Sequence, residues 1–243
     1  MKQKLKMKQL SLTCMFFILG MAEIQAQNII HSIETRDFYL MGQTYRQARN
    51  LAFDITYEYG DSASPAILES LNSNYRFRDG RMHAIIDSTE YIVGDKFCVA
   101  VYHEDSFVAV SKKPDIPDVF KLPLTDSIFL KSQVNSITSS LLNDSTKRIN
   151  LSFLPQSMYS GYTVDFDIRK YIIRNIQVFI KQPVSPSDPG SGVTRIVMKF
   201  SNYNSGIIQD SEFDEYRFIE YRNGSIQLRQ EYSNYQLLFN ADK

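Results

Sequence analysis

The chain has 243 residues, of which 43% are hydrophobic and 22% are charged, and its 27 basic residues balance its 27 acidic ones. This composition is typical of one globular domain with a substantial core. It argues against a nucleic-acid-binding protein, which needs a clustered excess of Lys and Arg. Fifteen Tyr and 16 Phe without any Trp favour β-structure, because these rings fit a pleated, half-buried surface.

Residues 1–26 have the features of a secretory signal peptide. Four lysines open the chain, Leu10–Met21 is an apolar run too short to span a bilayer, and Ala26 offers a small residue for cleavage after Ala26 or Gln27. A retained N-terminal anchor helix is the alternative. Removing four Lys and one Glu from 27 and 27 leaves 23 basic and 26 acidic residues, a net charge of −3. We therefore predict export to the periplasm and a mature chain, residues 27–243, that forms one domain without a membrane span.

Cys98 is the single cysteine of this mature chain, so an internal disulfide is not expected. A domain of this size can bury enough core to be stable without one. Cys98 lies in the apolar run Phe97–Tyr102. We interpret it as a buried small hydrophobic residue rather than a reactive thiol.

The first expected element of the mature chain is a helix that reaches about Asn50, with Asp37 as a candidate cap. Its apolar positions recur at spacings near three and four, at Ile29, Ile30, Ile33, Leu40, Tyr45, Ala48 and Leu51. The period then changes to two, since Phe53, Ile55, Tyr57 and Tyr59 alternate with Asp54, Thr56 and Glu58. That alternation predicts a strand with one apolar and one polar face.

Residues 71–111 predict a meander of four or five antiparallel strands. Short apolar runs alternate there with the turn signals Asp79-Gly80, Gly94-Asp95 and Glu104-Asp105. A connector with three prolines follows over residues 112–123. The apolar spacing of Thr125–Leu142 then predicts a second helix, although its many Ser and Asn residues lower helical propensity.

The second half of the chain predicts strands again. Alternation marks residues 149–153, 162–168, 176–180 and 196–200, and short C-terminal strands are expected at 212–220 and 237–240. Two helices cannot easily cover the apolar face of about ten or eleven twisted strands. We therefore expect an α+β fold in which a strongly curved antiparallel β-sheet has helices on its concave face and leaves apolar space there.

The sequence resembles the LolA/LppX-like superfamily, which includes the LolA periplasmic lipoprotein carriers, over most of residues 37–204. The stretches that carry the resemblance are LAFDITYEY (51–59), the meander from NYRFRDGRMHAII (74–86) to its proline-marked exit, and the strand pairs YTVDFDIRKYIIRNIQVFIKQPV (162–184) and VTRIVMKFSNYN (193–204). The resemblance implies an unclosed β half-barrel with helices as a lid, which holds acyl chains and moves lipoproteins or lipids across the periplasm. No family binding residue maps onto this chain, and the part after Ser205 matches less well.

The polar side chains do not form a catalytic or metal-binding motif. His103-Glu104-Asp105 is interpreted as a solvated turn rather than a metal site, because adjacent turn residues point in different directions. Asp165 and Asp167 share one strand face and are expected to face water rather than to form a catalytic carboxylate pair. The sequence also lacks nucleophile-elbow, zincin and phosphate-loop patterns. We expect no enzyme activity, no cofactor and no metal.

The candidate binding site is an apolar groove formed by inward-facing strand residues. Its members are Phe53, Ile55, Tyr57, Tyr75, Phe77, Phe97, Val99, Val101, Phe166, Ile168, Val178 and Met198. The alternative interpretation of each residue is plain core. The set suggests a carrier for lipid or lipoprotein acyl chains. The competing hypothesis is a scaffold subunit with an outer-membrane or envelope protein partner, for which Arg76, Arg78 and Arg81 would suit a protein interface.

Overall fold

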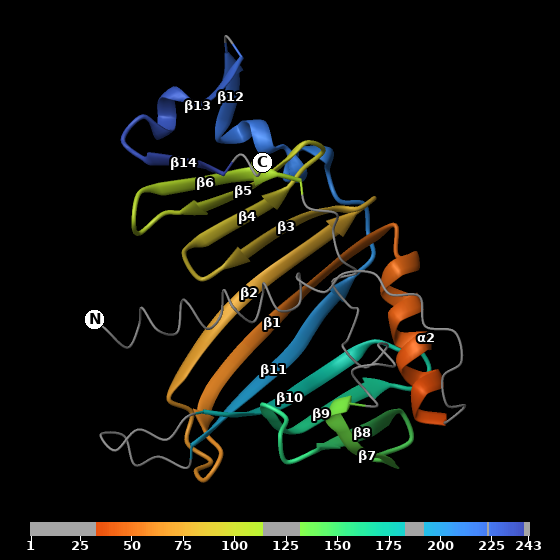
Figure 1. Cartoon of the computed structure of the whole chain (residues 1–243). Coiled ribbons are helices and arrows are strands. Elements are labelled where there is room, and N and C mark those ends of the chain that lie inside the picture. Colours follow the sequence, from red (N-terminus) through yellow and green to blue (C-terminus); the bar gives the residue numbers. More distant parts are fainter. Residues whose placement is uncertain (1–32, 114–131, 183–191, 223, 241–243) are drawn as a thin grey trace.

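The computed structural model describes residues 33–113, 132–182, 192–222 and 224–240. Its main feature is one twelve-stranded sheet with the strand order β14-β6-β5-β4-β3-β2-β1-β11-β10-β9-β8-β7 (Figure 1). Neighbouring strands are antiparallel except for β14, which pairs in parallel with β6. A separate hairpin, β12–β13, forms a second small sheet. The expected curved and mostly antiparallel sheet is therefore present.

The elements follow one another in a simple order. Helix α2 (Ile33–Gln47) leads into β1 (Asn50–Asp61), the long strand at the centre of the sheet. The meander consists of β2 (Glu69–Arg78), β3 (Arg81–Ile86), β4 (Thr89–Val93), β5 (Phe97–Tyr102) and β6 (Phe107–Lys112). The other wing consists of β7 (Val134–Leu141), β8 (Thr146–Phe153), β9 (Tyr159–Asp167), β10 (Ile173–Lys181) and β11 (Val193–Asn204). The chain ends with η2 (Asp210–Phe213), η3 (Glu215–Arg217), β12 (Ile219–Arg222), β13 (Ser225–Leu228), η4 (Gln230–Tyr232) and β14 (Gln236–Asn240).

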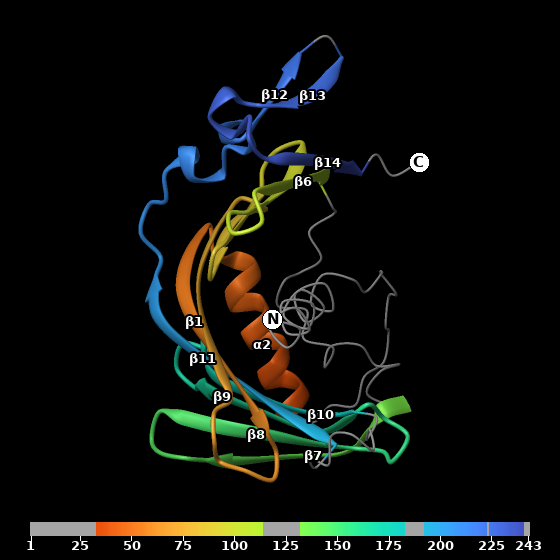
Figure 2. The same ribbon diagram turned by 90° about the vertical axis from the view of Figure 1, so that its left-hand side faces the viewer.

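The sheet curls without closing, and α2 lies inside the curve (Figure 2). From the end of β11 the chain passes along the outer, convex side to reach β12 (Figure 2). We call residues 205–222 and 224–240 the C-terminal segment. Among the described residues, no helix is long and apolar enough to cross a membrane.

The meander predicted from residues 71–111 is confirmed, and its strands β2–β6 are joined by short turns. The first turn, Asp79-Gly80, has positive φ angles of 49° and 73°. Two consecutive residues with positive φ form the turn whose twist matches that of a hairpin, and Asp-Gly tolerates this conformation best. Local sequence thus sets the register that pairs Arg78 with Arg81.

Three expected elements differ from the structure. The helix predicted over Thr125–Leu142 is wrong from Val134 onward, where β7 pairs with β8; Ser132 and Gln133 are helical, and residues 125–131 lie outside the described part. Asp37 does not cap a helix, because α2 already begins at Ile33. Much of the strand expected over 212–220 is instead the 3₁₀ turns η2 and η3. Among the described residues α2 is the one helix of several turns, so cover by helices is limited to it.

Apolar side chains form two separate clusters, one on each face of the sheet. The concave cluster gathers around α2 and includes Phe38, Met41, Phe53, Tyr75 and Phe166. The convex cluster lies between β4–β6 and the C-terminal segment and consists of Ile92, Val99, Val101, Val108, Val110, Phe218 and Ile219. The expectation of a single apolar face is therefore too simple for the meander, whose last strands are buried on both sides.

Candidate functional site

Helix α2 contributes the inner side chains Phe38, Met41 and Tyr45 to the concave face, all of which are buried. Their spacing of three and four residues places them on one side of the helix. Only Tyr45 was singled out from the sequence. The same spacing, extended back from Tyr45, could have found the other two.

The centre of the concave face is a stack of aromatic rings around Phe53. The ring of Phe53 lies 5.5 Å from that of Tyr75 and 5.8 Å from that of Phe77, with both pairs nearly parallel. The ring of Tyr203 is 5.4 Å away on the other side. Such ring pairs add stability beyond the area they bury. They give the middle of the curved sheet a rigid, apolar floor.

The hydroxyl groups of Tyr45 and Tyr203 on this face are hydrogen-bonded within the protein. The backbone N–H of Ile173 donates to the Tyr45 oxygen at 2.9 Å, and the Tyr203 hydroxyl donates to the carbonyl oxygen of Ile173 at 2.7 Å. The two hydroxyl oxygens lie 2.6 Å apart, so the Tyr45 hydroxyl can donate to Tyr203 and close the ring. Burial raises the pKa of Tyr45 to about 12. These phenols are therefore neutral, and they leave the concave face uncharged around them.

One ion pair crosses the concave side. The Lys147 ammonium on β8 lies 2.6 Å from the Asp37 carboxylate on α2, and both side chains are largely buried. A buried pair has little net effect on stability compared with apolar residues, but it fixes geometry because neither charge tolerates losing its partner. This contact sets where the first turns of α2 sit against the sheet.

Partly exposed apolar side chains surround the buried centre of the concave cluster. They come from both wings of the sheet and include Tyr57, Phe77, Ile86, Tyr102, Phe153 and Met198. An apolar surface that is only half covered by its own protein is the usual mark of a binding site for another apolar group. The concave face is therefore the candidate functional site.

The structure brings nine of the twelve predicted site residues together on this face. Phe53, Ile55, Tyr75, Phe166 and Val178 are buried in the concave cluster, and Tyr57, Phe77, Ile168 and Met198 pack against it. The remaining three, Phe97, Val99 and Val101, belong to the convex side instead. On β5 the alternate residues Cys98, Ala100 and Tyr102 face the concave cluster. Phe97, Val99 and Val101 therefore do not share a surface with the other nine.

The convex side is held by charged contacts to the C-terminal segment. Arg81 pairs with Asp210 at 2.8 Å, and Arg78 donates a hydrogen bond to the Ile208 carbonyl at 2.6 Å. Arg76 pairs with Glu212. The three arginines expected to suit a protein interface thus bind an acidic stretch of the same chain. They form an intramolecular contact.

Glu215 fastens the same segment to the turn between β4 and β5. Its carboxylate accepts hydrogen bonds from the backbone N–H groups of Asp95, at 3.2 Å, and Lys96, at 3.0 Å. The side chain passes directly over Gly94, where an added Cβ atom would lie 1.6 Å from a carboxylate oxygen. A glycine at this position is therefore required for the close approach.

Replacing Gly94 with alanine is expected to displace Glu215 and lower the free energy of unfolding by about 1–3 kcal/mol, the usual cost of overpacking. Gly80→Ala is an unsuitable comparison because Gly80 has positive φ; Gly206→Ala, whose nearest neighbour is a side chain at 3.0 Å, is the better control. Urea denaturation measures both. Equal stability of the Gly94→Ala protein and the parent chain would contradict this packing.

The remaining polar candidates have structural contacts. Asp165 and Asp167 were expected to face water, but both are buried. Asp165 accepts hydrogen bonds of 2.6 and 2.7 Å from Arg148. Asp167 accepts hydrogen bonds from the backbone N–H groups of residues 169 and 170. His103 lies in a turn with its Nδ1 3.2 Å from the Tyr235 hydroxyl. No group of His, Cys, Asp and Glu within the described ranges could hold a metal ion.

Cys98 packs against the concave cluster, as a small hydrophobic residue would. Burial raises the pKa of its thiol, although a hydrogen bond with Ser111 acts in the opposite direction. A raised pKa disfavours the thiolate, which is the reactive form.

No protein-family model and no curated protein matches the chain. Among solved structures, the chain is similar to an uncharacterized conserved protein from Thermus thermophilus, with 5% identity and a TM-score of 0.45 over 85% of this chain and 99% of that one. It is also similar to a LolA superfamily protein from Nitrosomonas europaea (8% identity, TM-score 0.35, 74% and 96% covered) and to LprF from Mycobacterium bovis (10% identity, TM-score 0.36, 71% and 95% covered). The superfamily that the sequence resembles is thus among the structures found. These likenesses are distant, and the function below is argued from the chain's own residues.

Proposed function

We propose that this protein is a periplasmic carrier that holds lipidated or other hydrophobic cargo against the concave face of its sheet. The observation that supports this proposal is the half-covered apolar surface around Phe53, where side chains of α2 cover the centre and partly exposed side chains surround it. An acyl chain needs an apolar surface of this kind and no reactive group. The neutral, internally bonded tyrosine hydroxyls fit such cargo, because they require no polar partner from it.

The energy available from such a surface is sufficient for cargo binding. Burying one methylene group contributes about 0.8 kcal/mol, so ten methylenes contribute roughly 8 kcal/mol before the cost of ordering the chain. A carrier must also release its cargo, and binding through apolar contact alone favours transfer to a second apolar surface. Sorting of outer-membrane lipoproteins is one transport process that would use this property.

The carrier proposal predicts that a charge on the concave face abolishes cargo uptake while the same charge one residue away does not. Met198 and Val197 are neighbours on β11, and both are partly exposed. Met198 packs against the concave cluster opposite Tyr57, whereas Val197 lies on the other face opposite Glu58. In Met198→Asp the carboxylate can keep water but repels an acyl chain. We expect uptake of a fluorescent fatty acid to fall about tenfold or more.

Val197→Asp is the matched control, and its uptake should stay within about twofold of the parent protein. Thermal midpoints of both variants establish that they are folded. Native mass spectrometry of the parent protein purified from the periplasm should show bound lipid. An empty parent protein that takes up no fatty acid, or equal uptake by the two variants, would count against the carrier. Sequencing of the mature N-terminus, expected at Gln27 or Asn28, tests the proposed export.

The second candidate function is a scaffold subunit of an envelope assembly. The outermost strands of the described sheet are β7 and β14, and β14 carries the exposed side chains Leu238 and Phe239. Edge strands of this kind can extend their sheet by pairing with another protein. A stoichiometric partner that co-purifies from solubilised envelopes would favour the scaffold, and a soluble monomer with bound lipid would favour the carrier.

A further inference from the structure

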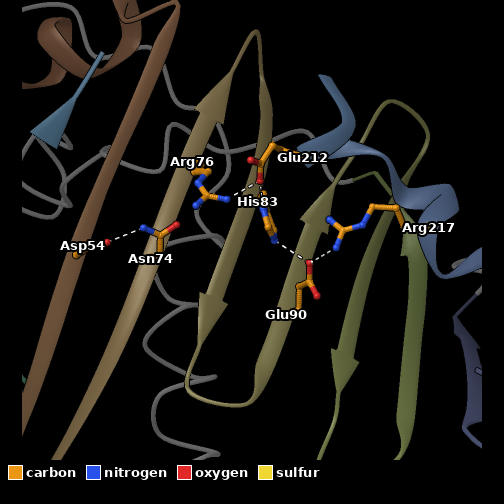
Figure 3. A network of polar contacts seen from close by, with 7 residues as sticks. All are labelled: Asp54, Asn74, Arg76, His83, Glu90, Glu212 and Arg217. Atoms are coloured by element: carbon orange, nitrogen blue, oxygen red, sulfur yellow. Dashed lines mark hydrogen bonds and ion pairs between the residues drawn. The ribbon is translucent and has the colours of Figure 1, made fainter. Parts of the chain in front are cut away.

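A buried histidine joins the sheet to the C-terminal segment. His83 on β3 has only 4% of its surface exposed. Its Nε2 lies 2.8 Å from a carboxylate oxygen of Glu90 on β4, and its Nδ1 lies 3.2 Å from a carboxylate oxygen of Glu212 in η2 (Figure 3). Glu90 belongs to the sheet and Glu212 to the C-terminal segment. The imidazole ring therefore joins the sheet to this segment, in addition to the arginine and Glu215 contacts described above.

Both ring nitrogens face oxygen atoms that only accept hydrogen bonds when the carboxyl groups are ionised. Glu90 is ionised well into the acid range: burial by itself would raise its pKa, but the hydrogen bond from His83 and the nearby Arg217 cation together lower it. Glu212 pairs with Arg76. A neutral imidazole has one N–H and can donate to only one of these carboxylates, whereas the protonated ring donates to both. The geometry of this contact therefore fits the protonated ring.

The charges around His83 come from every element packed against it. The carboxylates of Glu90 and Glu212 contact the ring, and each of them is also paired with a cation, Glu212 with Arg76 on β2 and Glu90 with Arg217 in η3. The His103 ring, 3.7 Å from Glu90, and the neutral Tyr232 phenol lie on the far side of Glu90. The two arginines balance the two carboxylates. The neutral and the protonated ring then differ in one hydrogen bond, which the second N–H of the protonated ring donates to a carboxylate.

We propose that the C-terminal segment is a pH-sensitive clasp, which His83 closes when it is protonated and loosens when it loses its proton. The protonated ring is stabilised by the closed clasp, so the stabilisation is present at lower pH and is lost as pH rises. At still lower pH the limit is set by Glu90. The stabilisation of the clasp by its carboxylate is present above the ordinary pKa of glutamate and is lost when the carboxylate is protonated as pH falls further. Loosening uncovers the convex cluster, whose members Val99 and Val108 are completely buried under the closed segment.

Amide hydrogen exchange of the whole protein tests the clasp. Peptides from residues 208–222 report on the C-terminal segment, and peptides from β9 and β10 serve as the internal reference. After correction for intrinsic exchange rates, protection of residues 208–222 should fall about tenfold or more between pH 5.0 and pH 8.5, the size expected for losing a hydrogen bond to a charged group. The reference peptides should change little.

Two variants identify the group responsible. His83→Gln carries no titrating ring, so its protection should be nearly the same at both pH values. His103→Gln removes the exposed histidine beside Glu90 and should keep the pH dependence of the parent protein. The proposal is overturned if protection in the parent protein does not depend on pH, or if His103→Gln removes the dependence. The parent measurement decides the matter even if His83→Gln does not fold.

Discussion

Replacing Val99 with aspartate is expected to prevent the protein from folding at ordinary temperature. Val99 is completely buried in the convex cluster, between β5 and the C-terminal segment. A carboxylate there would lose its water without gaining a partner, which typically costs several kcal/mol and equals much of a domain's total stability. Circular dichroism and thermal denaturation of the purified variant measure the effect.

The matched control for Val99→Asp is Ile85→Asp. Ile85 lies on the same convex face, on β3, but 40% of its surface is exposed. Its carboxylate can keep water, so the stability of this variant should stay within about 1 kcal/mol of the parent chain. A Val99→Asp protein with a normal thermal midpoint would show that the convex side is open at this point, contrary to the structure.

Replacing Lys147 with alanine is expected to lower the free energy of unfolding by about 3–5 kcal/mol, because it leaves the Asp37 carboxylate buried without its counter-charge. For a chain of this length the thermal midpoint should fall by roughly 6–20 °C. Hydrogen exchange should show the largest loss of protection in α2, which the ion pair holds against the sheet.

The double variant Asp37→Leu with Lys147→Met separates the cost of an unpaired charge from the contribution of the pair. Replacing a buried pair with apolar residues of similar size is often neutral or stabilising. We therefore expect this variant to regain most of the stability that Lys147→Ala loses. If the double variant is as unstable as the single one, the contact contributes through more than charge compensation.

Alternation of apolar and polar residues was sufficient to predict most strands of the main sheet. Residues 53–59, 149–153 and 196–200 lie within β1, β8 and β11, and the Asp79-Gly80 signal is a hairpin turn. The same kind of reasoning failed at Val134–Leu141. There Val134, Ile137 and Leu141 have helical spacing, yet the segment forms β7, because pairing with β8 outweighs a weak local preference among many Ser and Asn residues.

The sequence by itself predicted a curved, mostly antiparallel sheet, and nine of the twelve site residues proposed from it share the concave face. It could not determine which face Val99 and Val101 occupy, because apolar residues fill both sets of alternate positions along β5. Only the tertiary structure decided this, by placing Phe218 and Ile219 over the convex side. It also decided the surroundings of His83, since the partners Glu90 and Glu212 lie 7 and 129 residues away in the chain. Alternation at every second residue predicts that a side chain is buried, whereas long-range packing decides which segment buries it.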